Sequence, residues 1–455
     1  MRKAISRRNF IKLAGGGAAI AAGAGLLPRA MGKNVLQPIA VEAQGQFQLD
    51  GYDLFFGGTD GWIYLPPKPA IPPFHPDVLA PSPLTTYIFG FRNVTGLGDA
   101  QRANQKNKAQ HNAPLFWINQ NELFRVKLTN LGLALRPDLF DAHTLHWHGF
   151  RNVIPFFDGE PTGSVSVTPG NDFTYAYQAH DPGTYMYHCH VEDVEHVQMG
   201  MTGLVFIRPS QDGNTSLYPS GKYAYNDGDG STGYDREYAM FLSEVWAEAH
   251  WADAHIQLPE WSDYRADFAM INGRVYPDTI APNSPLQAPP YAATLRTIPF
   301  QTDPSTGDLL TNSGYEHLQY QPLSSLVKCN AGERVLLRFS NLGFKEAAMT
   351  LAGIRMRMIG KDATLLRGRD GTDISYETET LSFSAGESVD AIFTAPPYQG
   401  SPAGYDTYIL YNRRYAGANN LAADWNNAPV GRFGGQATEI HVYPNGVPAQ
   451  LLPNT

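Results

Sequence analysis

Short runs of roughly alternating apolar and polar residues, separated by turn formers, recur along the chain. Residues 121–130 (Asn-Glu-Leu-Phe-Arg-Val-Lys-Leu-Thr-Asn) form one such run, which is followed by Leu-Gly. Residues 185–190 and 204–207 are expected to be two further strands on either side of a loop. Alternation bounded by turns such as Pro169-Gly170 is typical of half-buried strands, so the pattern predicts an all-β sandwich.

A repeat lies within this pattern. Residues 333–343 (Glu-Arg-Val-Leu-Leu-Arg-Phe-Ser-Asn-Leu-Gly) match residues 122–132 position by position. Two shorter matches to the first half follow in the same order, at residues 346–353 and at residues 407–413. We therefore expect two sandwich domains in tandem.

The expected domain boundaries lie where turn formers accumulate. Residues 44–210 are predicted to form the first domain, and residues 236–455 the second. Residues 211–235, rich in Asp, Asn and Gly, are predicted to be a linker or a loop. Inside the first domain, the Pro- and Asn-rich stretch 57–110 is expected to form long surface loops.

The composition is that of a large, loop-rich β protein. With 455 residues that are 43% hydrophobic, the chain can bury a large core and is long enough for two or three domains. The 44 Gly and 34 Pro residues, with 12% aromatic residues, favour β structure over helical structure. The net charge of -9 argues against a nucleic-acid partner.

Residues 1–43 are interpreted as a targeting segment. Residues 6–12 (Ser-Arg-Arg-Asn-Phe-Ile-Lys) resemble the twin-arginine export motif, and the Gly- and Ala-rich apolar run 13–27 follows. That run is too short and too weakly apolar for a membrane span. The segment predicts export to the periplasm or the cell exterior, with no stable membrane span after cleavage.

Two stretches hold six of the thirteen histidines and most of the candidate chemistry. The first, residues 143–149, reads His-Thr-Leu-His-Trp-His-Gly and contains His143, His146 and His148. The second, residues 183–203, contains His188, Cys189, His190, His196 and Met201. A thiolate, two imidazoles and a weak thioether are the ligand set of a blue copper site, and these ligands suit copper better than calcium or magnesium.

Alternation along a strand separates the side chains next to Cys189. Successive side chains point to opposite faces, so Cys189 is expected to face one way and His188 and His190 the other. One copper is therefore expected on the Cys189 side, with a second metal position just behind it. The peptide between Cys189 and either histidine is a short covalent path for an electron.

Both stretches resemble motifs of the multicopper oxidases, the family of laccases and their relatives. The resemblance implies that type 1 copper is held by His143, Cys189, His196 and Met201. It implies that type 2 and type 3 copper are held by His146, His148, His188 and His190. His196 lies seven residues after Cys189, where laccases usually show five, which leaves Met199 as a rival axial ligand.

The resemblance also implies the fold, two tandem cupredoxin-like Greek-key β-sandwich domains with copper ligands only in the first. In the repeat, the positions of His143, His146 and His148 are taken by Ala347, Thr350 and Ala352. The positions of His188, Cys189 and His190 are taken by Tyr411, Asn412 and Arg413. The second domain is thus expected to be a copper fold without its ligands.

This absence bears on assembly. The family's trinuclear cluster takes eight histidines from two domains, whereas this chain offers four of them in matching motifs. A homo-oligomer could place the four histidines of two copies around one cluster, or a separate partner protein could supply the rest. Alternatively, the second domain packs over these histidines, and they hold one copper or none.

The resemblance implies an oxidase that oxidises a small-molecule or metal-ion reductant one electron at a time and reduces dioxygen to water, and the twin-arginine motif predicts that it is exported. A copper nitrite reductase is an alternative, because it uses the same type 1 ligands, although His146 and His190 would then be surplus. A type 1 electron-transfer protein without a catalytic cluster is another alternative. Asp158 and Glu160 could relay protons, or they could be solvated carboxylates at a turn.

Overall fold

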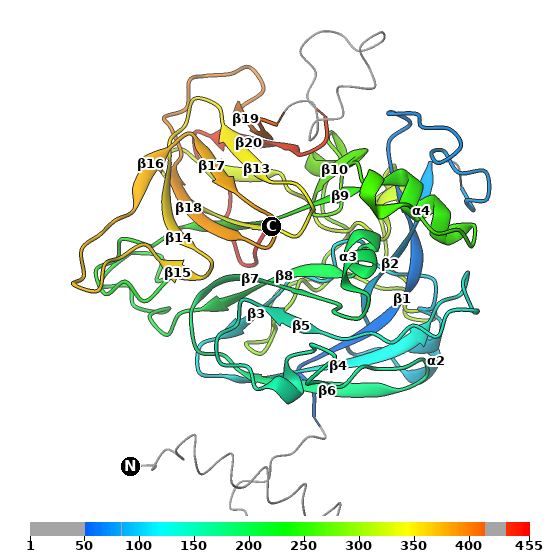
Figure 1. The fold of residues 1–455 in the computed structure, drawn as a ribbon. Helices are drawn as coiled ribbons and strands as arrows, with labels where there is room; N and C mark the ends of the chain where they lie inside the picture. The colour runs from blue at the N-terminus through cyan, green and yellow to red at the C-terminus, as the bar shows by residue number, and fades with distance from the viewer. Residues whose placement is uncertain (1–50, 83, 415–433) are drawn as a thin grey trace, which may run out of the picture. The chain divides into compact units, whose positions relative to one another are not determined.

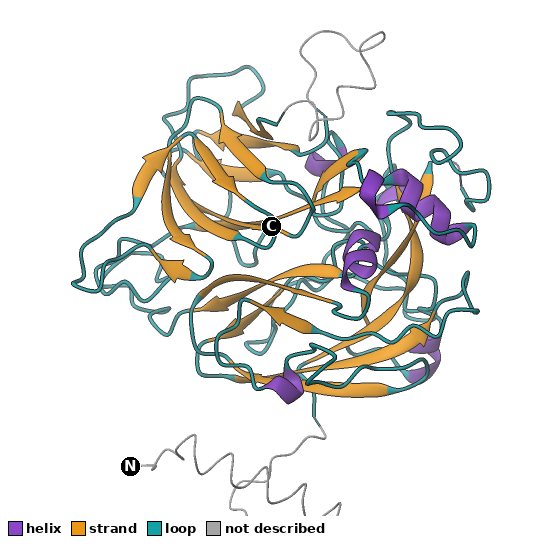
Figure 2. Cartoon of the chain, in the orientation of Figure 1, coloured by secondary structure: helices purple, strands orange, loops and turns teal. Residues whose placement is uncertain are grey.

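The chain folds into layers of β-strands joined by loops and a few short helices (Figures 1 and 2). The computed structural model describes residues 51–82, 84–414 and 434–455, so the predicted targeting segment lies outside the described residues. The described residues form four sheets, which build two sandwiches. The predicted all-β, tandem cupredoxin-like fold is confirmed.

The first sandwich consists of two four-stranded sheets with the strand orders β2-β1-β4-β6 and β3-β8-β7-β5. Its strands are β1 (Leu54–Tyr64), β2 (Thr85–Asn93), β3 (Phe116–Asn119), β4 (Leu123–Gly132), β5 (His146–His148), β6 (Asp172–Gln178), β7 (Gly183–His188) and β8 (Thr202–Arg208). Buried residues of β4 alternate with exposed or half-buried ones, as its sequence predicts. Side chains from both sheets share one core, in which the rings of Phe56 of β1 and Tyr187 of β7 are 5.9 Å apart.

The second sandwich consists of a seven-stranded and a five-stranded sheet. The first has the order β10-β9-β12-β18-β14-β15, with β16 also paired to β14, and the second has the order β11-β20-β19-β13-β17. The strands are β9 (Arg236–Val245), β10 (Phe268–Ile271), β11 (Val327–Asn330), β12 (Arg334–Asn341), β13 (Ala347–Leu351), β14 (Met356–Lys361), β15 (Thr364–Leu365), β16 (Tyr376–Thr378), β17 (Thr380–Phe383), β18 (Ser388–Thr394), β19 (Asp406–Asn412) and β20 (Ala437–Tyr443).

The two sandwiches repeat the same strand connections. β1 runs parallel to β4 and β4 antiparallel to β6, just as β9 runs parallel to β12 and β12 antiparallel to β18. β3 pairs with β8 in parallel, and so does β11 with β20. The second sandwich adds β14, β15 and β16 beyond β18, and β17 beyond β13. This is the sequence repeat in three dimensions.

The helices lie in the connections. They are α2 (Asp99–Ala103), α3 (Asp193–Met199) and α4 (Ala247–Ala254), with 3₁₀ turns η1 (Pro155–Phe157), η2 (Trp261–Asp263), η3 (Asp278–Ile280) and η4 (Glu316–Leu318). α3 joins β7 to β8 and ends at Gly200, whose φ of +117° favours glycine. A Cβ at Gly200 would also lie 2.8 Å from the His111 ring, so the helix ends against that side chain.

Residues 57–110 are not the long surface loops that their Pro and Asn content suggested. They contain most of β1 and all of β2, and β1 pairs with both β2 and β4. Two glycines obscured the alternation. A Cβ at Gly57 would lie 2.8 Å from Leu131, and one at Gly58 would lie 2.7 Å from the His143 ring. Glycine within this strand therefore marks close approach of neighbouring side chains.

A buried ionic network joins the two sandwiches. Glu237 of β9 accepts hydrogen bonds from Arg208 of β8 and from Arg338 of β12, the latter at 3.1 Å. Arg338 also lies 3.6 Å from Asp390 of β18, which accepts a 2.6 Å hydrogen bond from Thr184 of β7. Buried polar and charged residues of each sandwich thus have hydrogen-bond or ion-pair partners in the other sandwich.

Residues 211–235 lie against the second sandwich. The side chains of Tyr225 and Tyr234 are buried in a cluster with Leu336 and Ile359. The hydroxyl of Tyr225 donates a 2.6 Å hydrogen bond to Asp390. The domain boundaries near residues 44, 210 and 235 stay predictions.

Candidate metal centre

Three buried side chains converge on one point in the first sandwich. His143 lies before β5, Cys189 follows β7 and His196 is in α3, and their ligand atoms all lie within 4.8 Å of one another. Cys189 Sγ is 3.1 Å from Nδ1 of His196. The backbone N–H of Thr144 points at the same sulfur over 3.4 Å. This is a compact group of one thiol and two imidazoles.

The protein leaves polar atoms of this group without partners. Both ring nitrogens of His143 are buried and, among the described residues, have no hydrogen-bond partner. An unpaired buried polar atom costs about 1–3 kcal/mol, which a bound metal would offset by taking a ring nitrogen as ligand. Because a thiolate with two imidazoles is the equatorial set of blue copper sites, the residues fit copper.

Two buried methionines compete for the axial position. Met201 is buried in the short link between α3 and β8. Its carbonyl oxygen accepts the N–H of Cys189 over 3.0 Å. A Cβ at Gly58 would lie 3.5 Å from the Met201 methyl carbon and 2.7 Å from the His143 ring, so these two side chains flank one glycine. Met199 lies within α3 and is not among the side chains nearest to Gly58. The contacts favour Met201.

Charges within the group favour the metal-binding form of the thiol. Burial opposes ionisation of Cys189, but the positive charge of the adjacent His196 holds the thiol pKa well below its usual range. Burial alone would lower the pKa of His196, yet Cys189 and Asp141 raise it to about 10. The thiolate is the form that binds metal, so the site is prepared for a cation.

The other four predicted histidines form a second group. The ligand atoms of His146, His148 and His188 all lie within 4.8 Å of one another. His146 stands directly opposite His188 in the β5–β7 pair, and their ring centroids are 5.0 Å apart. The ring of His190 lies 4.8 Å from that of His146. Only one peptide bond separates Cys189 from His188 and from His190, so the two groups adjoin through the backbone.

The surroundings of this second group fix some of its nitrogens. Burial lowers the pKa of His146, His148 and, most strongly, His188, which keeps the imidazoles neutral as metal binding requires. Nδ1 of His146 donates to the carbonyl oxygen of Asp158 over 2.8 Å, leaving Nε2 free to face a metal. Nε2 of His148 lies 3.1 Å from the carbonyl oxygen of Gly386, so the second sandwich covers this histidine.

The equivalent place in the second sandwich holds different chemistry. Thr350 of β13 stands opposite Tyr411 of β19, in the register that pairs His146 with His188 in the first sandwich. Across residues 51–82, 84–414 and 434–455, the side-chain groups able to hold a metal all lie between Asp141 and His196. The alignment read from the sequence therefore matches the strand pairing.

Two histidines outside the motifs are engaged by the protein itself. His250 contacts the carbonyl oxygens of Tyr87 and Gln198 at 2.6 and 3.1 Å, and His255 lies 2.9 Å from the carboxylate of Asp77. Both therefore have structural partners.

Sequence reasoning missed two residues beside the ligands. Thr144 directs its N–H at Cys189 Sγ and accepts the N–H of His190 on its hydroxyl over 2.9 Å. Asp141 places a carboxylate oxygen 3.7 Å from Nε2 of His196. Their only signal in the sequence is position, because Thr144 lies within the motif 143–149 and Asp141 lies two residues before it.

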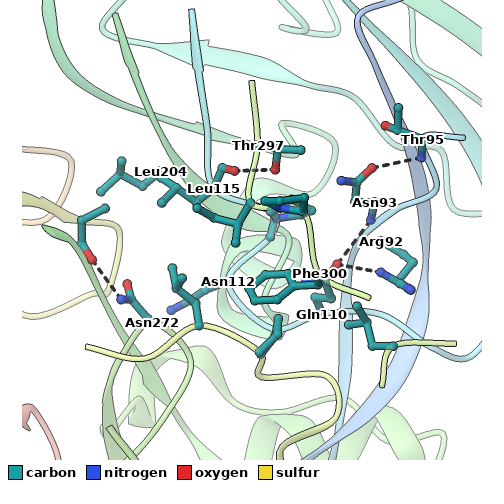
Figure 3. Close-up of a pocket in the computed structure, with 18 of the residues that line it drawn as sticks. Arg92, Asn93, Thr95, Gln110, Asn112, Leu115, Leu204, Asn272, Thr297 and Phe300 are labelled. Atoms are coloured by element: carbon teal, nitrogen blue, oxygen red, sulfur yellow. Dashed lines mark hydrogen bonds between the residues drawn. The ribbon is translucent and has the colours of Figure 1, made fainter. Parts of the chain in front are cut away.

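A mostly apolar cavity of about 200 Å³ lies near the loop that carries these ligands (Figure 3). Leu115, Leu204 and Phe300 line it, and none of the predicted copper ligands does. His111, which also lines it, packs against Gly200, between Met199 and Met201. A small apolar molecule in this cavity would thus be separated from the loop by one side chain.

The structure combines tandem cupredoxin-like sandwiches, a Cys-containing ligand group and an adjoining all-histidine group. Residues 102–212 match the multicopper oxidase family model, which confirms the resemblance read from the motifs in this part of the chain. This makes the chain a relative of copper-dependent oxidoreductases.

Curated relatives match over short regions. Laccase 1 of Metarhizium robertsii is 34% identical over 114 residues, which cover 24% of this chain and 18% of that protein. Laccase-1 of Emericella nidulans is 31% identical over 140 residues, 29% of this chain and 22% of the relative. The multicopper oxidase MmcO of Mycobacterium tuberculosis is 44% identical over 55 residues, 12% of this chain and 10% of the relative. These alignments span less than a quarter of each relative's length.

Solved structures are similar over most of the chain. The blue copper oxidase of Nitrosomonas europaea has a TM-score of 0.53 at 19% identity, covering 85% of both chains. The multicopper oxidase mgLAC has a TM-score of 0.51 at 18% identity, covering 88% of both. A copper-containing nitrite reductase of Thermus scotoductus has a TM-score of 0.50 at 14% identity, covering 88% of this chain and 65% of that one. At such identities these likenesses establish the fold alone.

Proposed function

We propose that this chain is an exported copper oxidoreductase that takes electrons one at a time from a small reductant and delivers them to dioxygen. His143, Cys189, His196 and Met201 would hold the copper that accepts these electrons, and the second histidine group would hold the metal that receives them next. The observation that carries the proposal is the single peptide bond between Cys189 and His188, which joins the two ligand groups. Copper, when bound, supplies a one-electron redox couple at each group.

The chain's own residues hold these groups in place. Burial of Cys189 and His196 excludes water from the thiolate, and the Thr144 N–H stabilises its charge. The Asp158 carbonyl oxygen fixes the ring of His146. The Asp158 carboxylate lies 3.6 Å from the same ring nitrogen, and burial raises its pKa, so it is our candidate for holding a proton beside the second group.

Four histidines of one chain are half of a trinuclear ligand set, so the described residues of one chain do not fit a complete three-copper cluster. We propose that a homo-oligomer shares ligands between copies, with a separate partner protein as the alternative source. The contact of Gly386 with His148 supports the competing interpretation, that the second sandwich covers the group. Native mass spectrometry of the copper-loaded protein separates these: a monomer with at most one copper beyond the type 1 ion would overturn shared ligation.

Export is proposed from the twin-arginine motif in residues 6–12, which lie outside the described part of the chain. Among the described residues, no helix is both long and apolar enough to cross a membrane. The periplasm or the cell exterior is the proposed location. Replacing Arg7 and Arg8 with Lys should leave the folded protein in the cytoplasm, as fractionation followed by immunoblotting would reveal.

A copper nitrite reductase is the second candidate function. The specific observation in its favour is that His146, His148 and His188 alone form a compact three-imidazole group, which suits one catalytic copper. A plain type 1 electron carrier is the third. Copper content of about one per chain supports the carrier, about two the nitrite reductase, and more the oxidase.

Turnover assays test the proposal directly. Oxygen uptake with a phenolic donor is expected, and nitrite consumption is not. His188→Ala should retain the blue colour of the type 1 site but stop oxygen uptake. His180→Ala, which changes a side chain that is 66% exposed, is the matched control and should retain both. Nitrite turnover without oxygen uptake in the native protein would favour the second candidate instead.

A further inference from the structure

Exposed apolar side chains gather on four segments around His196, residues 71–82, 132–142, 191–199 and 247–263. Together these segments are called the acidic apolar face. The exposed apolar residues on it include Val78, Leu79, Phe140, Val194, Ile256 and Leu258. Leu258 is 94% exposed, Val78 88% and Phe140 76%. Single exposed apolar residues are ordinary, but a group of them marks an interaction site.

Contacts between side chains hold the four segments together. Arg136 donates to the carbonyl oxygen of Asp253 over 2.9 Å, which joins the second segment to the fourth. His250 lies 3.1 Å from the carbonyl oxygen of Gln198, which joins the fourth to the third, and α3 and α4 both contact β2 (Figure 1). His255 binds the carboxylate of Asp77, which joins the fourth to the first. The four segments therefore pack against one another.

This surface reaches the type 1 ligand group. Asp141 lies 3.7 Å from Nε2 of His196, on the side of the ring away from Cys189. Phe140 precedes Asp141 and is exposed, and Val194 lies two residues before His196 and is half exposed. A molecule seated on Phe140 and Val194 would be separated from the ligand His196 by the Asp141 side chain alone.

The charge on the face has one sign. The four segments carry ten Asp and Glu residues, of which Asp77 and Asp253 are buried, and Arg136 is their one Lys or Arg. Arg136 is itself buried, with its guanidinium bonded to Asp138. This imbalance is far stronger than that of the whole chain, which has 43 acidic and 34 basic residues. The face would attract a positively charged molecule and steer its approach.

We infer that the acidic apolar face docks a basic electron-carrier protein, which donates one electron to the group of His143, Cys189 and His196. The inference rests on the proposed function of that group and extends its donor from small reductants to a protein. In each encounter the reduced carrier loses one electron and copper(II) becomes copper(I), with no bond made or broken. Apolar contact surrounded by complementary charge suits such an encounter, because electron-transfer complexes are small and short-lived.

Binding is tested with the full chain and a basic c-type cytochrome in its ferrous form, by calorimetry at low ionic strength. Both the copper-free and the copper-loaded protein should bind it, and added salt should weaken binding. Phe140→Ser with Val194→Ser should weaken binding by about tenfold or more, because both remove apolar contact beside the ligand. Ile374→Ser, which alters an apolar side chain that is 55% exposed on another loop, is the control and should bind normally.

Stopped-flow reduction of the copper-loaded protein supplies a second readout. The double variant should lose its blue colour more slowly with ferrous cytochrome, but at the native rate with ascorbate, which needs no docking surface. Native affinity in the double variant, or equal binding of an acidic flavodoxin, would overturn the inference. So would a native oligomer, seen in sedimentation, that the double variant dissociates, because a second copy would then occupy the face.

These outcomes are distinguishable from failure of the proposed function. If the protein never forms a blue copper site, the proposed function fails, while calorimetry on the copper-free protein still judges the docking surface. If colour, copper content and ascorbate reduction are normal but the cytochrome does not bind, the docking inference alone fails.

Discussion

The two sandwiches share a backbone plan and differ in what they place at one position. Strands β5 and β7 bring His146 opposite His188, whereas β13 and β19 bring Thr350 opposite Tyr411. Thr350 satisfies its hydroxyl with a 2.8 Å hydrogen bond to Thr380. The same strand pairing thus supports either a metal-ligand group or an ordinary protein hydrogen bond.

The counterpart of Cys189 makes the difference sharper. Asn412 accepts the N–H of Ala348 over 3.1 Å and donates to the side chain of Gln436 over 2.8 Å, and its own N–H reaches the Gln436 carbonyl over 2.9 Å. Cys189 receives the Thr144 N–H, and its own N–H reaches the Met201 carbonyl. In the second sandwich two side-chain amides, those of Asn412 and Gln436, bond to each other at the position where the first sandwich could bind a metal.

This comparison teaches that the fold does not depend on the ligands. In the second sandwich each polar group at the shared position finds a protein partner, which is how buried polar groups are normally stabilised. In the first sandwich the nitrogens of His143 find none among the described residues. Metal binding would therefore account for the unpaired nitrogens of the first site, and changing the ligands should alter function far more than folding.

The largest expected effect comes from making the first site resemble the second. Cys189→Asn should abolish the blue colour and remove about one copper per chain, because an amide cannot replace the thiolate. The protein should still fold, since the introduced amide oxygen could accept the Thr144 N–H as Asn412 accepts that of Ala348. Visible absorption, copper analysis and circular dichroism measure these three results.

The control is the other cysteine. Cys329 is a free, buried thiol in β11, which pairs with β20, and it is remote in sequence from the ligand motifs. Cys329→Ala should keep the colour and the copper content. Retained blue colour in Cys189→Asn would mean that the thiolate ligand has been assigned wrongly.

The next largest effect concerns the network that joins the two sandwiches. Glu237→Ala would leave the fully buried Arg338 and the half-buried Arg208 without their shared carboxylate. Removing one partner of a buried ion pair typically costs about 3–5 kcal/mol, so we expect a large loss of stability in chemical denaturation. Glu377→Ala breaks the exposed pair with Arg355 and is the matched control, for which little change is expected. Equal effects of the two substitutions would contradict the importance of the network.

The same carboxylate predicts a pH dependence. Burial would raise the pKa of Glu237, but the charges of Arg208 and Arg338 outweigh it and lower the pKa to about 2, from an ordinary 4.5. A carboxylate with a lowered pKa stabilises the fold above its unfolded pKa. Its contribution should therefore be complete above pH 4.5 and lost as the pH falls towards 2. Melting temperatures across this range should fall more steeply for the native protein than for Glu237→Gln, and parallel curves would contradict the assignment.

The sequence was sufficient to predict the features that are marked by ligand motifs or by strand periodicity. The alternation of β4 and its repeat in β12 predicted both sandwiches. The motifs within 143–149 and 188–201 singled out the side chains that the structure places in two groups. The all-β fold and the resemblance to the multicopper oxidases followed from these features. What the motif residues do as copper ligands stays a prediction.

Other features could not be read from the sequence because they depend on packing. β1 was missed because Gly57 and Gly58 interrupt its pattern for the sake of neighbours distant along the chain. The contact between the Gly386 carbonyl oxygen and His148 joins residues 238 positions apart in the chain, and no sequence motif predicts it. The acidic apolar face joins four separate segments, so only the folded chain displays it.

The smallest expected effect distinguishes the two candidate axial ligands. The strand pairs β7–β8 and β19–β20 have the same register, because His188 pairs with Thr202 as Tyr411 pairs with Ala437. Met201 and Gln436 each precede the second residue of these pairs, so the two positions correspond. Gln436 contacts the side chain of Asn412, the counterpart of Cys189, which indicates that the Met201 position faces the ligand group. Met201→Leu should therefore keep copper bound and the protein blue, while removal of a weak axial donor raises the reduction potential. Met199→Leu, a change of the same size in the neighbouring helix, should leave the potential unchanged. Redox titration followed by the blue absorption measures both, and a shift in Met199→Leu without one in Met201→Leu would reverse the assignment.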